Sequence, residues 1–198
     1  MRSVRALVVT LRPHQFIKNL FVAAPLIFAK RLTDLDAALT TVGAVLAFCA
    51  LSGAVYAIND VVDVDKDRAH PKKRLRPVAA GTLSLRAAWL GGAMLAAGAL
   101  GAAFFLSPAF GFVAAAYLVV NIAYSFLLKN VPFVDVITIA GGFLLRVLGG
   151  AFAISVPASP WLLACTGLLA AFLGFGKRAH ELQNDRAEGA KARGPASP

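Results

Sequence analysis

Long runs of apolar residues, separated by short polar segments, are the main pattern along this chain of 198 residues. A helix that crosses the hydrocarbon core of a membrane needs about 20 mostly apolar residues. Six runs approach or reach that length and predict an all-α integral membrane protein. The expected spans are residues 16–29, 37–58, 87–106, 108–128, 132–154 and 160–176.

Prolines and small polar residues mark the starts of two of these spans. Ser107-Pro108 and Ser159-Pro160 each place a capping serine before a proline at the first helical position. Pro25 lies inside the first and shortest run. Because that run is short and proline lacks a backbone N–H, we expect the span to begin earlier, near Pro13, and to be kinked.

The basic residues lie mostly on one side of the predicted spans. One side receives 17 of the 20 Lys and Arg residues, and the other receives only Lys30 and Arg31. Arg146 lies within a span. Basic residues favour the cytoplasmic side of a membrane. This distribution predicts a multi-pass membrane protein, with both termini and the loop at residues 59–86 in the cytoplasm.

Composition supports the membrane prediction and narrows the choice of partners. The chain is 59% hydrophobic and only 15% charged, which is typical of integral membrane proteins. Its net charge is +10, and the basic residues lie in short segments between apolar runs, as residues that set membrane topology do. We therefore expect contact with membrane lipid and no binding of nucleic acid.

The most polar stretch is residues 59–76, NDVVDVDKDRAHPKKRLR. If a helix continues through its acidic half, Asn59, Asp60, Asp63 and Asp67 fall within about 100° of arc, and Asp65 points away. Clustered carboxylates repel one another, and oxygen-only ligands favour Mg²⁺ bound together with a phosphate substrate. This geometry predicts a Mg²⁺ site, with a solvated loop of mixed charge as the alternative.

A second acidic cluster follows the sixth span. Lys177, Glu181 and Asp185 are spaced by four residues and share one helix face on the same side of the membrane. A surface ladder of ion pairs is the simpler interpretation. Alternatively, Glu181 and Asp185 converge with the first cluster on one or two Mg²⁺ ions that bridge a diphosphate.

Three further sets of polar residues lie inside or beside the spans. Residues 12–19 carry Lys18 and Asn19 into the start of the first span, and residues 121–129 place Tyr124 and Lys129 on one face. Arg146 points the same way as Asp135, but the two lie about 16 Å apart along a helix. Arg146 therefore contacts either another helix or an anionic ligand.

These residues carry a resemblance to a known family. The run from Asn59 to Asp67 is similar to the NDxxDxxxD motif of the UbiA superfamily of intramembrane prenyltransferases. Within that superfamily, RPHQFIKN at residues 12–19 and HPKKRLRPVAAG at 70–81 are most similar to the decaprenyl-phosphate phosphoribosyltransferases. So are Tyr124-Ser125 with Lys129, GGFLLRVLGG at 141–150, and Gly176-Lys177-Arg178 with Glu181.

The resemblance implies a Mg²⁺-dependent membrane glycosyltransferase. Its expected reaction moves the 5-phosphoribosyl group of phosphoribosyl diphosphate (PRPP) to a polyprenyl phosphate and releases diphosphate, in cell-wall arabinan synthesis. Asp60, Asp63 and Asp67 are the implied catalytic residues. The implied metal ligands are Asn59, Asp60, Asp63, Asp67, Glu181 and Asp185. The candidate substrate-binding residues are Lys18, Asn19, Asn59, Lys73, Arg74, Tyr124, Lys129, Arg146, Lys177 and Glu181.

The resemblance also implies nine spanning helices, of which this chain supplies six. We expect one UbiA-like domain over residues 1–186 and a disordered tail over 187–198, which is also the expected point of truncation. Two other interpretations stay open: transfer of a prenyl group to an aromatic or lipid acceptor, and an inactive membrane fragment. The sequence also leaves a homo-oligomer open.

Overall fold

The computed structural model describes residues 2–128 and 134–192, and every regular element among them is helical. The main helices are α1 (Arg2–Leu11), α2 (Ala24–Phe28), α3 (Leu35–Val62), α4 (Val64–Ala69), α5 (Leu85–Leu106), α6 (Pro108–Ala123), α7 (Val134–Ala153) and α8 (Pro160–Ala192). Two 3-10 helices, η1 (Pro13–Ala23) and η2 (Lys73–Leu75), and a π-helix, η3 (Tyr124–Leu128), complete the order.

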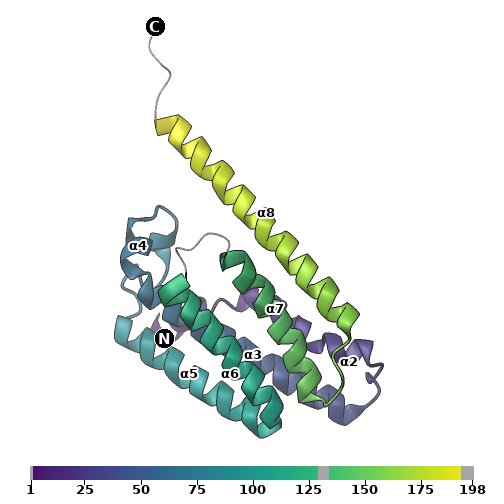
Figure 1. Cartoon of the computed structure of the whole chain (residues 1–198). Helices are drawn as coiled ribbons and strands as arrows, with labels where there is room; N and C mark the ends of the chain where they lie inside the picture. The colour runs from purple at the N-terminus through teal and green to yellow at the C-terminus, as the bar shows by residue number, and fades with distance from the viewer. Residues whose placement is uncertain (1, 129–133, 193–198) are drawn as a thin grey trace.

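Helix α3 is the centre of the bundle. It packs against α5, α6, α7 and η1; α5, α6 and α7 follow one another as neighbours, and α8 packs against α7 (Figure 1). The rings of Phe48, Phe110 and Tyr117 meet in the main core, with Phe48 and Tyr117 centroids 5.1 Å apart. Because α3 is apolar on all sides, it suits a position surrounded by other helices.

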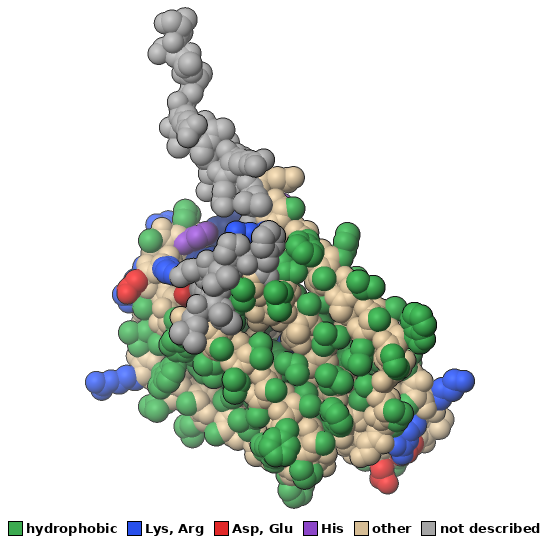
Figure 2. Space-filling model, viewed as in Figure 1, with side chains coloured by type: hydrophobic (Ala, Val, Ile, Leu, Met, Phe, Trp, Pro, Cys, Tyr) green, Lys and Arg blue, Asp and Glu red, His purple; other side chains and the backbone are tan. Residues whose placement is uncertain are grey.

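Among the described residues, five helices are long and apolar enough to cross a membrane: α3, α5, α7, the α6 segment through Phe126, and α8 through His180. Large apolar side chains cover the outer face of the bundle, while charged side chains gather toward its ends (Figure 2). That distribution is expected where hydrocarbon contacts the middle of each helix.

The first predicted span, at residues 16–29, is an irregular helical segment that begins at Pro13, as expected. That segment is the 3-10 helix η1 followed by the five-residue helix α2, which begins next to Pro25. Close packing accompanies this irregular backbone: a Cβ atom on Gly150 of α7 would lie 1.8 Å from the carbonyl oxygen of Val22. Only glycine lets α7 approach η1 this closely.

The sixth helix is longer than predicted. The expected span ends at residue 176, whereas α8 continues to Ala192 and extends beyond the rest of the bundle (Figure 1). It therefore includes residues 187–192, which the sequence assigned to a tail. Residues 193–198 lie outside the described part of the chain.

Candidate active site

Asp60, in the last turn of α3, is buried with 1% of its surface exposed. Its Oδ1 atom accepts hydrogen bonds from Nη2 of Arg12 and from Nη1 of Arg76, the latter at 3.3 Å. The same Nη1 atom donates to Oδ2 of buried Asp67 at 2.7 Å. Arg76 thus bridges two carboxylates, and we call these four residues the carboxylate–arginine cluster.

Segments that are distant in sequence bring the two arginines to Asp60. Arg12 lies between α1 and η1 with a φ of 53°, a costly conformation for a residue other than glycine, and its guanidinium lies 4.9 Å from the Tyr56 ring centroid. Arg76 follows η2. A small apolar cluster holds α1 and this loop against the end of α3; its buried members are Ala6, Val78, Leu83 and Ala88.

The assumption of one continuous helix through the acidic motif is wrong, but Asp60 and Asp67 still lie on the same side, as predicted. Helix α3 ends at Val62 and α4 begins at Val64. Backbone bonds from Asp63 to Asn59 and from Asp67 to Asp63 preserve the four-residue repeat across this junction. Asp60 and Asp67 therefore still meet. Asp65 does point away: its side chain is 91% exposed and lies 3.6 Å from Arg68.

The carboxylate–arginine cluster contains oxygen atoms that suit Mg²⁺, and two guanidinium groups lie beside these oxygens. Carboxylate and amide oxygens are the ligands that this hard cation prefers. Among the residues that the structure describes, no three His, Cys, Asp or Glu side chains converge on one metal position. Arg76 lies where it neutralises both Asp60 and Asp67. The donor chemistry fits the metal, provided that Arg76 moves.

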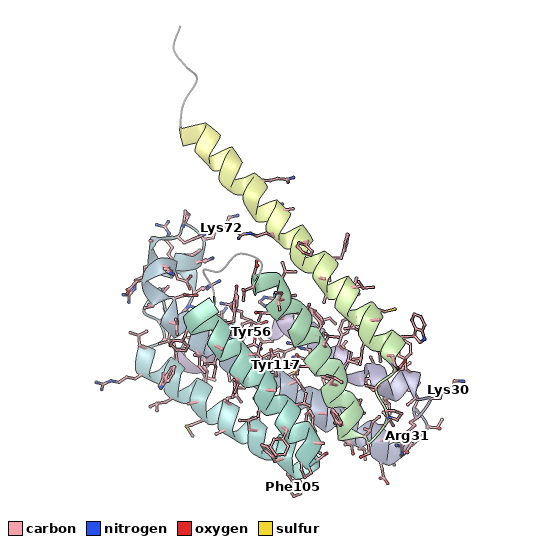
Figure 3. The ribbon with its side chains drawn as sticks, in the orientation of Figure 1. Lys30, Arg31, Tyr56, Lys72, Phe105 and Tyr117 are labelled. Atoms are coloured by element: carbon pink, nitrogen blue, oxygen red, sulfur yellow. The ribbon has the colours of Figure 1, made fainter. Side chains whose placement is uncertain are left out.

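A pocket of about 170 Å³ opens beside this cluster, between α3, η1, α6 and α7. Four predicted substrate-binding residues lie on its wall: Lys18, Asn59, Tyr124 and Arg146. Tyr56 and Tyr117 also line it and lie in the interior of the bundle, whereas Lys72 lies on the outer loop (Figure 3). The fold therefore joins residues from distant parts of the sequence around one cavity.

Asn19 supports this pocket from behind and is completely buried. Its Oδ1 atom accepts a bond of 2.8 Å from Nε of Arg146, and its Nδ2 atom donates to Ser52 at 3.1 Å. Asn19 is not among the residues that line the cavity. Its place in the structure is that of a residue that orients Arg146, in contrast to the substrate contact expected from the sequence.

The π-helix η3 positions Asn59 from the opposite side. Ser125 Oγ contacts both Oδ1 of Asn59 and the carbonyl oxygen of Asn121, the latter at 2.7 Å. π-helical turns often occur at functional sites because they redirect a side chain without ending the helix. The sequence predicted a polar face on this helix, but the contact of Ser125 with Asn59 depends on the packing of α6 against α3.

The other predicted site residues are not brought to the pocket wall by the described structure. Lys73 and Arg74 are exposed on η2. Lys129 lies outside the described residues, as do the side chains of Lys177, Glu181 and Asp185. The two arginines of the carboxylate–arginine cluster were not selected from the sequence. The signal that points to them is physical: buried carboxylates require cationic partners.

Comparison with known proteins now identifies the family. The model of the UbiA prenyltransferase family matches residues 20–192. The chain belongs to this family. Together with its five long apolar helices, UbiA membership makes it a multi-pass membrane protein.

Among curated UbiA relatives, the chain is similar to two enzymes named decaprenyl-phosphate phosphoribosyltransferase. It is 38% identical to that of Mycolicibacterium smegmatis over 195 residues, which cover 96% of this chain and 61% of the relative. It is 36% identical to that of Corynebacterium glutamicum, with coverage of 92% and 56%. The chain thus spans about three fifths of the length of these relatives.

The fold is also that of solved UbiA structures. A UbiA homolog from Archaeoglobus fulgidus, bound to GPP and Mg²⁺, matches with a TM-score of 0.78 and 22% identity, over 93% of this chain and 66% of that one. The same kind of homolog bound to DMAPP and Mg²⁺ gives a TM-score of 0.65 at 21% identity, with coverage of 86% and 59%. At these identities the likeness shows the fold.

Proposed function

We propose that this chain transfers the 5-phosphoribosyl group of PRPP to a polyprenyl phosphate and releases diphosphate. The observation that carries the proposal is its 38% identity, over 96% of its length, to an enzyme named for that acceptor and that group. The geometry supports it, because a pocket with Lys18 and Arg146 on its wall suits a donor that carries several phosphates.

The diphosphate of the donor binds at the carboxylate–arginine cluster. Asn59, Asp60, Asp63 and Asp67 would hold Mg²⁺, which would supply positive charge against the leaving diphosphate. Arg12 and Arg76, now paired with Asp60 and Asp67, would donate hydrogen bonds to phosphate oxygens. Glu181 and Asp185 are proposed as further ligands, and Lys73, Arg74, Lys129 and Lys177 as further phosphate contacts.

The transfer reaction needs little acid–base catalysis. An oxygen of the acceptor phosphate forms a bond to the anomeric carbon, and the bond from that carbon to the diphosphate oxygen breaks. The acceptor is already an anion at neutral pH, so no proton has to be removed from it. Proximity and charge stabilisation are what the protein supplies.

The acceptor's apolar tail lies in the lipid next to the exposed apolar faces of the bundle. We place the site at the cytoplasmic face of the bacterial plasma membrane, because 17 of 20 basic residues lie on its side of the spans. The product would serve as a precursor for cell-wall arabinan.

Transfer of label from PRPP to lipid tests the proposal directly. The purified full chain, in lipid vesicles with Mg²⁺ and polyprenyl phosphate, is incubated with PRPP labelled in the ribose. Label should enter the lipid-extractable fraction and depend on both Mg²⁺ and Asp60. If no label enters that fraction while the protein is folded, the proposal fails.

A second candidate is transfer of a prenyl group from a prenyl diphosphate. It is favoured by the match of residues 20–192 to the prenyltransferase family as a whole. The same vesicles are supplied with labelled geranyl diphosphate and an aromatic acceptor. Consumption of that donor, with no incorporation from PRPP, would replace the first proposal with the second.

A further inference from the structure

Arg146 is a charged residue near the centre of a membrane bundle, and 6% of its surface is exposed. Its polar contacts are neutral: Asn19 Oδ1 at 2.8 Å, the carbonyl oxygen of Gly142 at 2.9 Å and the hydroxyl of Tyr117 at 2.9 Å. Among the described residues, no carboxylate lies within ion-pair distance of it. A buried charge of this kind is costly unless an anion compensates it.

Aromatic rings hold the guanidinium in place without neutralising it. Its central carbon lies 4.8 Å from the ring centroid of Tyr117, 5.6 Å from that of Phe143 and 6.0 Å from that of Phe48. A guanidinium has five N–H groups. Three of them donate to the neutral partners named above, so two are left to donate to a further acceptor.

The pocket wall at Arg146 lies deeper in the bundle than the wall at Asn59. Arg146 is bonded to Asn19, which in turn is bonded to Ser52 of α3. Ser52 precedes Asn59 by seven residues, so the two are about 10 Å apart along the helix axis. The pocket therefore has an outer end near the carboxylate–arginine cluster and an inner end at Arg146.

We propose that Arg146 forms an anion subsite at the inner end of this pocket and binds a phosphate monoester. The subsite rests on the proposed function only for the identity of that monoester. Because the diphosphate belongs at the outer end, the inner phosphate is either the 5-phosphate of the ribosyl donor or the phosphate of the lipid acceptor. Both present the same chemistry to a planar guanidinium, which binds two phosphate oxygens at once.

Binding to the detergent-solubilised full chain, with EDTA present, tests the subsite without any transfer reaction. The two probes are ribose 5-phosphate and farnesyl phosphate. Arg146→Gln should weaken binding of one probe by roughly ten- to a hundredfold, as expected for loss of charge-assisted hydrogen bonds. Arg86→Gln is the matched control, because it removes the same charge from an exposed position on α5 and should leave affinity unchanged.

The outcomes are distinct. Loss of ribose 5-phosphate binding assigns the inner end to the donor, and loss of farnesyl phosphate binding assigns it to the acceptor. Equal affinities in Arg146→Gln and the unsubstituted chain, or no binding of either probe, overturn the proposal. If Arg146→Gln does not fold, Arg146→Lys keeps the charge but lacks the planar fork, and a loss below about threefold then overturns it.

The subsite and the proposed transfer reaction fail separately. Transfer of label from PRPP that persists while Arg146→Gln binds both probes normally would remove only the subsite. Phosphate binding that depends on Arg146, without any transfer of label, would remove only the reaction.

Discussion

Asp60 and Arg146 are both buried charges in this bundle, but the fold pairs only Asp60 with opposite charges. Two guanidinium groups, from Arg12 and Arg76, meet the carboxylate of Asp60. The guanidinium of Arg146 meets an amide, a carbonyl and a hydroxyl group. The first site contains its own counter-charges and must exchange them to bind a metal, whereas the second has donors left for an anion.

The two sites also differ in how freely their arginine side chains can move when a ligand binds. The arginines at Asp60 are partly exposed, 24% for Arg12 and 29% for Arg76, so they can leave toward the solvent side when a cation arrives. The environment of Arg146 is packed and aromatic, which holds its guanidinium in one position. A partly exposed cluster suits a metal–diphosphate complex, and a packed cation suits a phosphate that must be placed accurately.

The largest expected effect is the loss of activity in Asp60→Asn. Turnover of labelled PRPP should fall at least about a hundredfold, because a neutral amide no longer balances the charge of Mg²⁺ and is a weaker ligand than a carboxylate. Asp65→Asn is the matched control in the same motif, and it should retain turnover within about twofold, since Asp65 is exposed. Equal losses in the two variants would show that Asp60 has no special role.

The next effect concerns the stability of the carboxylate–arginine cluster. Arg76→Gln leaves two buried carboxylates with one cation fewer, which should cost about 2 kcal/mol of unfolding free energy given the partial exposure of Arg76. Mg²⁺ should then restore more stability to Arg76→Gln than it adds to the unsubstituted chain. Unfolding in detergent, with and without Mg²⁺, measures both quantities.

Arg68→Gln is the control for that experiment. It removes the exposed partner of Asp65, so its unfolding free energy should change by less than about 0.5 kcal/mol. If Mg²⁺ stabilises Arg76→Gln no more than the unsubstituted chain, the metal does not replace Arg76 between Asp60 and Asp67.

A smaller effect is expected at the guanidinium of Arg146. Tyr117→Phe keeps the ring but removes the hydroxyl that accepts from Nη2 of Arg146, which should cost about 1–2 kcal/mol of unfolding free energy. Phe110→Leu in the same core is a useful comparison, because its loss is apolar and should not respond to phosphate. Added ribose 5-phosphate or farnesyl phosphate should recover stability in Tyr117→Phe, and no recovery with either would argue against the freed N–H being available to an anion.

The smallest effect is at the exposed ion pair of the opposite membrane face. The N–H of Ala37, and then Arg31, stabilise the Asp34 carboxylate and lower its pKa below the usual 3.8. A lowered pKa adds stability above pH 4 that is lost as pH falls through the folded-state value. The melting temperature of the unsubstituted chain should slightly exceed that of Asp34→Asn at pH 6, and the gap should close toward pH 3. A gap that is constant with pH would contradict this assignment.

Much of the fold follows from the pattern of apolar residues alone. Residues 37–58, 87–106, 108–128 and 132–154 each fall largely within one helix or a helix and its π-helical extension, because long apolar runs have to satisfy their backbone groups internally in lipid. Residues 16–29 are less regular than a single apolar run suggests. Hydropathy cannot register the contact between Gly150 and Val22 that accompanies the irregular backbone there.

The sequence by itself determined the family, the helical spans and the spacing that unites Asp60 with Asp67, since these depend on local periodicity and on motifs read along the chain. Only the tertiary structure decided which charges compensate one another. Arg12 reaches Asp60 across 48 positions and Arg146 reaches Asn19 across 127, because separate helices pack side by side. Packing in three dimensions made one buried charge an ion-paired cluster and left the other facing a pocket.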